Sequence, residues 1–269
     1  MEATASGPAG DGGGATSRAA IAMEGLSKRY GSFDAVSALT LAVQPGEVFG
    51  FLGPNGAGKT TTIRMLMGIL VPTAGRAHIA GLDCQRERAE VKRQVGYLPD
   101  NPIFYDYLRA REILEFVAEM HGQPARTARR RAGALLESLA LADAAEEFAI
   151  NYSMGMKKKL ALACALIHEP SVLILDEPTN GLDPLAAREV RQLLLDAAAG
   201  GKTIFLSTHL LDLAERLCNR IGIIHGGRLV EVGTLADLRQ KLAPGGSLEE
   251  IFIKVTSERD GGQVGAVGG

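Results

Sequence analysis

A glycine-rich loop that ends in a lysine is the segment of the sequence with the most specific chemistry. It consists of eight consecutive residues: Gly53, Pro54, Asn55, Gly56, Ala57, Gly58, Lys59 and Thr60. The run matches the pattern G-x-x-x-x-G-K-[ST] and stands after an expected strand and before an expected helix, where phosphate-binding loops occur. Glycines let backbone N–H groups point inward around a phosphate at a helix N-terminus. The loop therefore predicts nucleotide binding in preference to a glycine-rich turn that binds nothing.

Three side chains at the end of this loop have separate expected roles. Lys59 is placed to reach the β- and γ-phosphates, and the hydroxyl of Thr60 is placed to ligate Mg²⁺. Thr61 adds a further hydroxyl for a phosphate hydrogen bond. These roles predict a bound nucleoside triphosphate with Mg²⁺, but nucleotide binding alone does not separate kinases, GTPases, helicases and transporters.

Acidic side chains and a histidine follow two other expected strands. The apolar run Val172–Leu175 leads into Asp176 and Glu177, and His209 follows the expected strand Thr203–Ser207. Buried unpaired carboxylates are costly, so acids at the carboxyl end of a strand usually face a ligand crevice. We expect Asp176 to hold Mg²⁺ directly or through water, and Glu177 to act as the general base for an attacking water. His209 is expected to contact the γ-phosphate and hold that water in line, although a single histidine at a strand end is more often structural.

An α/β fold is required to position these residues. The N-terminal part predicts a small antiparallel layer and then a buried strand, from the runs Ile21–Leu26, Ala35–Val43 and Glu47–Leu52. The loop then leads into an expected helix over Thr62–Leu70, and Arg76–Ala80 and Val95–Leu98 predict further strands. Between 100 and 167 the pattern is helical, with expected helices over Arg109–His121, Ala125–Leu139 and Met156–Ile167.

The alternation of strands and helices returns after this helical segment. We expect the following elements: strand Val172–Leu175, helix Pro184–Ala199, strand Thr203–Ser207, helix His209–Asn219, strands Ile221–His225 and Arg228–Val232, and helices Leu235–Leu242 and Leu248–Val255. The continuous apolar strands suit a parallel sheet that is covered on both faces. The sequence therefore predicts a mixed sheet with an inserted helical subdomain at about 100–167, in one domain over 21–257.

The composition limits the class of protein. The 269 residues carry a net charge of −2, which predicts no overall attraction to nucleic acid or anionic lipid. Three dispersed cysteines indicate neither a disulfide framework nor a zinc site. No apolar run has the length of a membrane span, and the N-terminus lacks the pattern of a signal peptide. The segments 1–20 and 258–269 are expected to be flexible tails because their composition is poor in core-forming residues.

Three further motifs resemble those of the ATP-binding cassette (ABC) proteins. The segment Asn151–Met156, before a lysine-rich helix, resembles the family's signature motif, and Asp176–Pro184 is similar to its Walker B and D-loop run. Tyr30 resembles the aromatic residue that stacks on adenine. The resemblance covers Ile21 to about Ile253, with the motifs in the family's order. It implies the P-loop NTPase fold of the ABC ATPase type, with ATP and Mg²⁺ as cofactors.

The resemblance also implies partners and a mechanism. In the family two cassettes pair head to tail, so Ser153 and the backbone of Gly155 would contact the γ-phosphate held by Lys59 of a second copy or of a homologous cassette. Asp183 would lie near the dimer axis and couple the two sites. Hydrolysis would then drive a membrane-spanning permease subunit that is encoded separately. The expected location is peripheral, at the cytoplasmic face of the cell membrane.

Two positions depart from the common family pattern. The signature is Tyr152-Ser153-Met154-Gly155-Met156 in place of Leu-Ser-Gly-Gly-Gln, and Asp100 stands where the Q-loop glutamine is expected. A carboxylate is a good Mg²⁺ ligand, so Asp100 is a candidate metal ligand; slower hydrolysis is the other interpretation. Both variants, and the tail segment 248–252, resemble the export branch with ABC-2 type membrane partners, which includes drug and polysaccharide exporters.

There are two rival hypotheses. One is a non-hydrolysing ATP-binding regulator, against which the intact Glu177 and His209 argue, and the other is a soluble ABC ATPase that acts on ribosomes or DNA. The chain carries one cassette, whereas translation-type members usually carry two, and no sustained heptads separate Lys59 from Ser153. The basic residues of 126–131 and 157–159 are explained by solvated helix faces, so no nucleic-acid partner is expected. The aromatic residues Phe104, Tyr105 and Tyr107 suit either a docking surface for the permease or ordinary packing.

Overall fold

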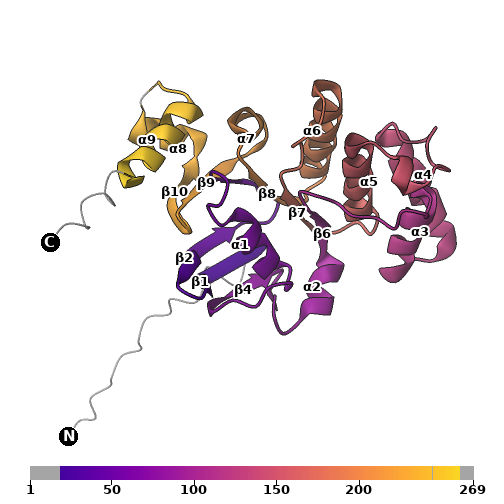
Figure 1. Cartoon of the computed structure of the whole chain (residues 1–269), viewed down its shortest axis with the longest axis horizontal. Coiled ribbons are helices and arrows are strands. Elements are labelled where there is room, and N and C mark those ends of the chain that lie inside the picture. Colours follow the sequence, from indigo (N-terminus) through magenta and orange to yellow (C-terminus); the bar gives the residue numbers. More distant parts are fainter. Residues whose placement is uncertain (1–18, 244, 261–269) are drawn as a thin grey trace, which may run out of the picture.

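The computed structural model describes residues 19–243 and 245–260 (Figure 1). Most of the segment expected as an N-terminal tail lies outside these residues, but its last two residues, Ala19 and Ala20, are buried. The backbone N–H of Ala20 donates to the carbonyl of Val43 at 2.8 Å, so ordered structure begins before residue 21. At the other end the last helix, α9 (Leu248–Asp260), enters the expected C-terminal tail, of which 261–269 lies outside the described residues.

An antiparallel sheet occupies the N-terminal part of the chain. Its strand order is β2-β1-β4-β5. The strands are β1 (Ile21–Tyr30), β2 (Phe33–Val43), β4 (Ala74–Ile79) and β5 (Leu82–Asp83). Ile21 pairs with Val43 on one side and with Ile79 on the other, and all three side chains are fully buried. The predicted antiparallel layer is confirmed; β5 was not predicted because two residues carry no periodicity.

A six-stranded sheet forms the centre of the molecule. Its order is β10-β9-β3-β8-β7-β6, in which only the β10–β9 pair is antiparallel. The strands are β3 (Val48–Leu52), β6 (Val95–Leu98), β7 (Val172–Asp176), β8 (Thr203–Thr208), β9 (Arg220–His225) and β10 (Arg228–Thr234). Every residue of β3, β7 and β8 is buried, which explains why each of these strands contains a run of apolar residues.

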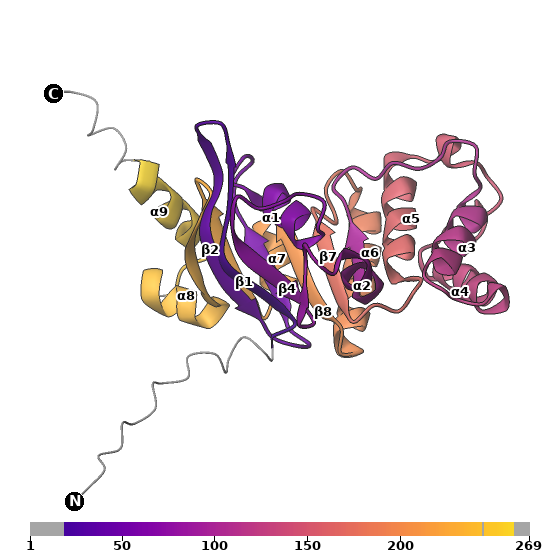
Figure 2. The same cartoon turned by 90° about the horizontal axis from the view of Figure 1, so that it is seen from below.

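Successive side chains of the central strands enter two different cores, because strand side chains alternate between faces. Phe205 of β8 packs with Phe51 of β3 and with Ile63 of α1 (Lys59–Leu66), on the side of the antiparallel sheet. The next residue, Leu206, belongs to the opposite core with Leu194 of α6 (Pro184–Ala199) and Leu217 of α7 (Leu211–Leu217). Figures 1 and 2 show α1 and the antiparallel sheet on one side of the central sheet and α6 and α7 on the other.

A helical lobe is inserted between β6 and β7 and forms one end of the molecule (Figure 2). Its helices are α3 (Ala110–Met120), α4 (Ala125–Ser138) and α5 (Met154–Leu166). The prediction of an inserted helical subdomain is confirmed. A helix that was not predicted, α2 (Arg88–Gln94), precedes β6; it buries only Val91, so it has no apolar stripe to detect.

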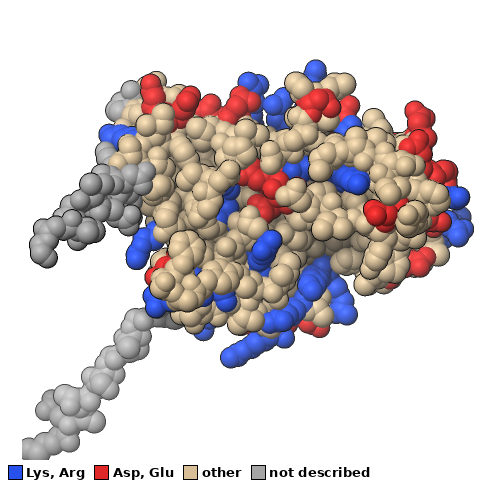
Figure 3. Space-filling model, viewed as in Figure 1, with Lys and Arg blue, Asp and Glu red and all other residues tan. Residues whose placement is uncertain are grey.

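The remaining helices and the charges complete the surface. Helix α8 (Leu235–Leu242) and helix α9 pack with β9 in a third, smaller core. Basic side chains gather at the lower edge of the molecule, where α2 carries Arg88, Lys92 and Arg93, and charges of both signs are interspersed over much of the rest of this face (Figure 3). Among the described residues, no helix combines the length and the apolar character needed to cross a membrane.

Candidate nucleotide site

The parallel register brings three segments to one edge of the central sheet: the phosphate loop after β3, the acidic residues at the end of β7 and the residues that follow β8. Leu52 of β3 pairs with Thr208 of β8, and Ser207 of β8 pairs with Asp176 of β7. The residues that follow these strands, including Glu177 and His209, therefore emerge side by side. Ligands of open α/β sheets bind in the crevice outside the carboxyl ends of such strands.

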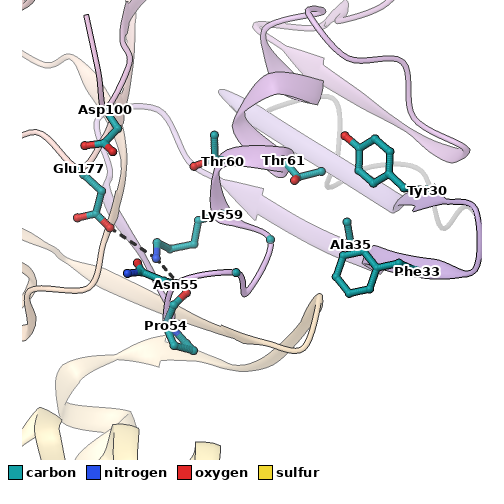
Figure 4. A pocket seen from close by; sticks show the side chains of 12 residues that line it. Tyr30, Phe33, Ala35, Pro54, Asn55, Lys59, Thr60, Thr61, Asp100 and Glu177 are labelled. Atoms are coloured by element: carbon teal, nitrogen blue, oxygen red, sulfur yellow. Dashed lines mark hydrogen bonds and ion pairs between the residues drawn. The ribbon is translucent and has the colours of Figure 1, made fainter.

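A pocket of about 320 Å³ lies at this edge (Figure 4). It is lined by Tyr30, Phe33, Ala35, Pro54, Asn55, Gly56, Gly58, Lys59, Thr60, Thr61, Asp100 and Glu177. The structure thus assembles in one cavity the expected adenine-stacking residue, most of the phosphate loop, the expected metal ligand after β6 and the expected base. Gly53 and Ala57 belong to the same loop without lining the cavity.

The phosphate loop requires glycine at its junction with α1. Gly58 has a φ of 107°, and a Cβ atom there would lie 2.6 Å from the carbonyl oxygen of Ala35. No side chain caps the N-terminus of α1, which starts at the next residue, Lys59. The first N–H groups of a helix have no intrahelical partner and carry a partial positive charge. This arrangement leaves donors available for an anion.

Lys59 is buried, with a relative exposure of 6%, and crosses the loop towards the acidic strand. Its Nζ donates to the carbonyl oxygens of Gly53 at 2.6 Å and Pro54 at 3.2 Å. The same Nζ lies 3.5 Å from Oε1 of Glu177, an ion pair that Figure 4 marks across the pocket. A phosphate in the loop would take over the role of these oxygens as the acceptor for the ammonium group.

Glu177 is held in an uncommon backbone conformation. Its φ is +50°, which for a non-glycine residue costs roughly 1–3 kcal/mol and persists only where the surroundings impose it. The backbone N–H of Glu177 donates to the carbonyl of Ser207 at 3.0 Å. Nδ1 of His209 lies 3.0 Å from Oε1 of Glu177, and the His209 backbone N–H donates to Oε2 at 3.4 Å. The conformation therefore aims the carboxylate at Lys59 and the pocket.

Asp176 is the most deeply buried acid of the site, with a relative exposure of 1%. The hydroxyl of Ser207 donates to its Oδ1, whereas Oδ2 is buried without a hydrogen-bond partner. A buried, unsatisfied carboxylate oxygen is costly unless something else binds it. The free oxygen fits a hydrated Mg²⁺, since carboxylates and waters are the ligands this ion prefers. Thr60 and Asp100, the other oxygen donors that are expected to bind this ion, line the neighbouring pocket.

Burial, assisted by the negative charge of the site, changes the ionisation of a nearby residue, Tyr97. Burial raises the pKa of Tyr97 to about 12, and the charges of Asp176 and Asp100 act in the same direction, while Arg64 opposes them. The Tyr97 phenol therefore stays neutral beside the pocket. Asp100 itself accepts hydrogen bonds from the side-chain amides of Asn101 at 3.1 Å and Asn180 at 3.3 Å.

Ser153 and Gly155 do not line this pocket. They lie at the N-terminus of α5, in the helical lobe, where Ser153 is the N-cap residue and its hydroxyl accepts from the backbone N–H of Met156 at 3.2 Å. Ser153 is exposed and Gly155 is partly exposed. Their position agrees with the expectation that they serve the nucleotide of another copy; that role stays a prediction.

Several residues of the site were missed by the sequence analysis. Phe33 pairs with Tyr30 across the β1–β2 turn and lines the same pocket with 61% of its surface exposed. Ser207 binds Asp176, and Lys158 contacts Asp100. A polar residue at the end of the neighbouring strand was a usable signal for Ser207. Nothing local marked Phe33, whose partner is brought close by the turn. The interpretation of 157–159 as a solvated helix face is wrong at Lys158, which is buried because tertiary packing brings its partners together.

Comparison with known proteins shows that the chain is similar to ATP-binding subunits of ABC transporters. The family model described as "ABC transporter" matches residues 36–180. The chain is similar to the daunorubicin resistance ATP-binding protein DrrA3 of Streptomyces coeruleorubidus, with 41% identity over 247 residues that cover 92% of this chain and 76% of that protein. It is also similar to the probable multidrug ABC transporter ATP-binding protein YbhF of Escherichia coli, with 37% identity over 87% of this chain. The match spans only 41% of the length of YbhF.

A solved structure gives the same result. The structure of an ATP-binding subunit of an ABC transporter superimposes with a TM-score of 0.82 and 35% sequence identity. The superposition covers 87% of this chain and 98% of that one. The similarity therefore includes the antiparallel sheet, the central sheet and the inserted helical lobe together.

Proposed function

Because the chain belongs to the ABC transporter family, as an ATP-binding subunit with ATPase activity, we propose that it drives the export of a small molecule through a separate membrane-spanning subunit. The observation that carries the catalytic part is the contact of Lys59 with Glu177 beside the unpaired oxygen of Asp176. The proposal of export rests on relatives that are named for daunorubicin resistance and multidrug transport. The proposed location is the cytoplasmic face of the membrane.

The residues of the site have separate roles in the hydrolysis of ATP. The loop N–H groups and Lys59 bind the β- and γ-phosphates of ATP, and the base stacks on Tyr30 with Phe33 beside it. Asp176, Thr60 and Asp100 would hold Mg²⁺, which neutralises charge on the phosphate oxygens. Glu177 orients a water towards the γ-phosphorus and accepts its proton as the bond to the ADP oxygen breaks. His209 contacts Oε1 of Glu177, the same oxygen that Lys59 approaches, and its backbone N–H donates to Oε2, so it fixes the carboxylate.

A second copy, or a homologous cassette, supplies the other half of each site. Gly155 supports this proposal, because its own fold does not require a glycine. The φ of Gly155 is not positive, and an added Cβ would meet nothing nearer than Leu182 Cδ2 at 3.6 Å. Since the fold of the chain does not require a glycine here, the absence of a side chain is suited to the close approach of another molecule. At a helix N-terminus, a phosphate is the group that such a backbone binds.

The membrane-spanning partner is proposed to dock near the loop that leads into the helical lobe. An apolar groove of about 470 Å³ lies there, lined by Tyr105, Asp106, Tyr107, Leu108 and Phe116. Tyr105 and Tyr107 are about three-quarters exposed, and Ile103 close by is almost completely exposed. Exposed aromatic groups with apolar neighbours mark protein interfaces more often than ordinary surface. These exposures favour the docking interpretation over ordinary packing.

The proposal is tested with the variant Glu177→Gln, which keeps the shape of the side chain and removes the base. With MgATP it is expected to bind nucleotide without turnover and to double its mass in gel filtration with light scattering. The matched control is Glu177→Gln combined with Lys59→Met, which should stay monomeric because the loop no longer holds the phosphates. A monomer in both cases contradicts the paired arrangement. Purification of the tagged chain from solubilised membranes without a multi-span protein, but with ribosomal or DNA-repair proteins, contradicts the transporter assignment.

A further inference from the structure

Three segments that are distant in the sequence meet at the ammonium group of Lys158. This residue belongs to α5 of the helical lobe and has a relative exposure of only 2%. Its Nζ donates to the backbone carbonyl of Asn180 at 3.1 Å and lies 3.4 Å from Oδ1 of Asp100. The side-chain amide of Asn180 donates to the same Oδ1 at 3.3 Å, which closes a triangle. The helical lobe is thereby joined to the loop after β6 and to the loop after β7.

A buried lysine at this position requires an explanation. Lysine is almost never fully buried unless it is paired, because removing its charge from water is costly. Burial lowers the pKa of Lys158, while Asp100, Glu177 and Asp176 favour its charged form. The adjacent Lys157 is partly exposed, so a lysine of α5 can lie in solvent where no partner is needed. The cost of burying Lys158 is offset only by the groups that it holds.

The Asn180 carbonyl is part of the turn that begins at Glu177. The backbone N–H of Asn180 donates to the carbonyl of Glu177 at 3.2 Å. At the other end of this turn, the N–H of Glu177 donates to Ser207 of β8. The turn is therefore fixed to the central sheet at Glu177 and to the helical lobe through Lys158. These bonds maintain the left-handed backbone of Glu177, which an unconstrained chain would leave.

We propose that Lys158 is a positioning residue for ATP hydrolysis, which holds the turn of Glu177 through Asn180 and ties its geometry to the helical lobe. The inference rests on the proposed role of Glu177 as the base. Asp100 contributes the counter-charge that keeps the ammonium group in place. Because Ser153 and Gly155 lie on the same helix as Lys158, a shift of the helical lobe on nucleotide-driven pairing would be transmitted to the base through this contact.

The test compares Lys158→Met with Lys157→Met in the full chain. Single-turnover hydrolysis, with protein in excess over radiolabelled ATP, gives the rate of the chemical step, and a fluorescent ATP analogue gives the nucleotide affinity. Lys158→Met is expected to lower the rate at least about tenfold, since small displacements of a catalytic group cost up to about 100-fold. The affinity should change by less than about threefold, because Lys158 does not line the pocket. Lys157→Met should match the unaltered chain in both measurements.

A second variant separates the two contacts of Lys158 and guards against a folding defect. In Lys158→Met with Asp100→Asn no carboxylate is left without its cation, so the chain is expected to fold, but the bond to Asn180 is still missing. Because Asp100 is also a proposed Mg²⁺ ligand, the rate of this double variant is compared with that of Asp100→Asn alone, and it should be at least about tenfold lower. The inference is overturned if the double variant recovers the full rate of hydrolysis of Asp100→Asn, or if the rate of Lys158→Met is within twofold of that of Lys157→Met. Absence of hydrolysis in the unaltered chain, or no effect of Lys59→Met, would instead contradict the proposed function itself.

Discussion

The substitution Gly155→Ala separates what the chain needs for folding from what it needs for pairing. Gly155 is the second residue of α5, without a positive φ, and the added methyl group would make ordinary contacts at 3.6 Å with Leu182 and 3.9 Å with Ser153. Replacing glycine by alanine in a helix stabilises a chain by roughly 0.5–1 kcal/mol where the conformation permits it. We therefore expect the free energy of unfolding without nucleotide to stay the same or to rise by up to about that amount.

The effect on pairing should have the opposite sign. A methyl group at the N-terminus of α5 would stand between the backbone N–H groups and the phosphate of a second copy. Losing one hydrogen bond to a charged group costs about 1.5–3 kcal/mol, which corresponds to a roughly 10- to 100-fold loss of ATP-dependent dimer affinity. The same factor should appear in the hydrolysis rate if the paired state is the one that reacts.

Two assays measure these effects on one preparation. Urea unfolding without nucleotide gives the stability, and light scattering with MgATP, in the Glu177→Gln background, gives the dimer affinity. A Gly155→Ala variant that is destabilised by more than about 1 kcal/mol would mean that the glycine serves its own fold. A variant that dimerises as tightly as the parent would mean that no phosphate approaches this helix. Either result refutes the argument for pairing through α5.

Three further predictions concern the stability and the nucleotide affinity of the single chain. Gly58→Ala, where φ is 107° and the new Cβ would lie 2.6 Å from the Ala35 carbonyl, should lower the free energy of unfolding by at least about 1–3 kcal/mol, measured by urea unfolding. Lys59→Met should lower the affinity for a fluorescent ATP analogue at least about tenfold without loss of cooperative unfolding; an unchanged affinity would show that the loop is not the phosphate site. Burial and the nearby His121 lower the pKa of His168 from 6.5 to about 4 in the folded chain. As the pH falls, the His168 imidazole is therefore protonated in the unfolded chain before it is protonated in the folded chain. The free energy of unfolding should consequently fall as the pH drops from 6.5 to 4. The urea midpoint should be less sensitive to pH over this range in His168→Gln, and an equal sensitivity would assign the effect to other groups.

Sequence patterns were sufficient where the signal is local. Helix α6 was predicted with its correct bounds because Asp183 caps it and Pro184 occupies its first turn, a combination that specifies a helix start independently of the tertiary fold. The bounds of β6 were also predicted, and β7 and β8 were predicted with each strand one residue longer in the structure. The phosphate loop could be found in the same way, since its function needs a fixed spacing within one short segment.

Local patterns failed where distant residues decide the outcome. Helix α1 was expected to reach Leu70 but ends at Leu66, where Met67 caps it and Gly68 turns the chain with a φ of 65°. Helix α2 carries a single buried residue and so lacks the periodicity on which prediction depends. The glycine at 68 was a local stop signal that the prediction did not use, whereas α2 is placed by packing, which no short window of sequence contains.

The sequence by itself determined the chemical groups of the site and the order of the elements that carry them, because both are written in short segments with fixed spacing. Only the tertiary structure decided how these groups are held. The positive φ of Glu177, its contacts with Lys59 and His209, the unpaired oxygen of Asp176 and the burial of Lys158 all depend on strands and helices that meet from far along the chain. A residue's type limits the bonds it can form, but its partner, its burial and its backbone strain are properties of the folded chain.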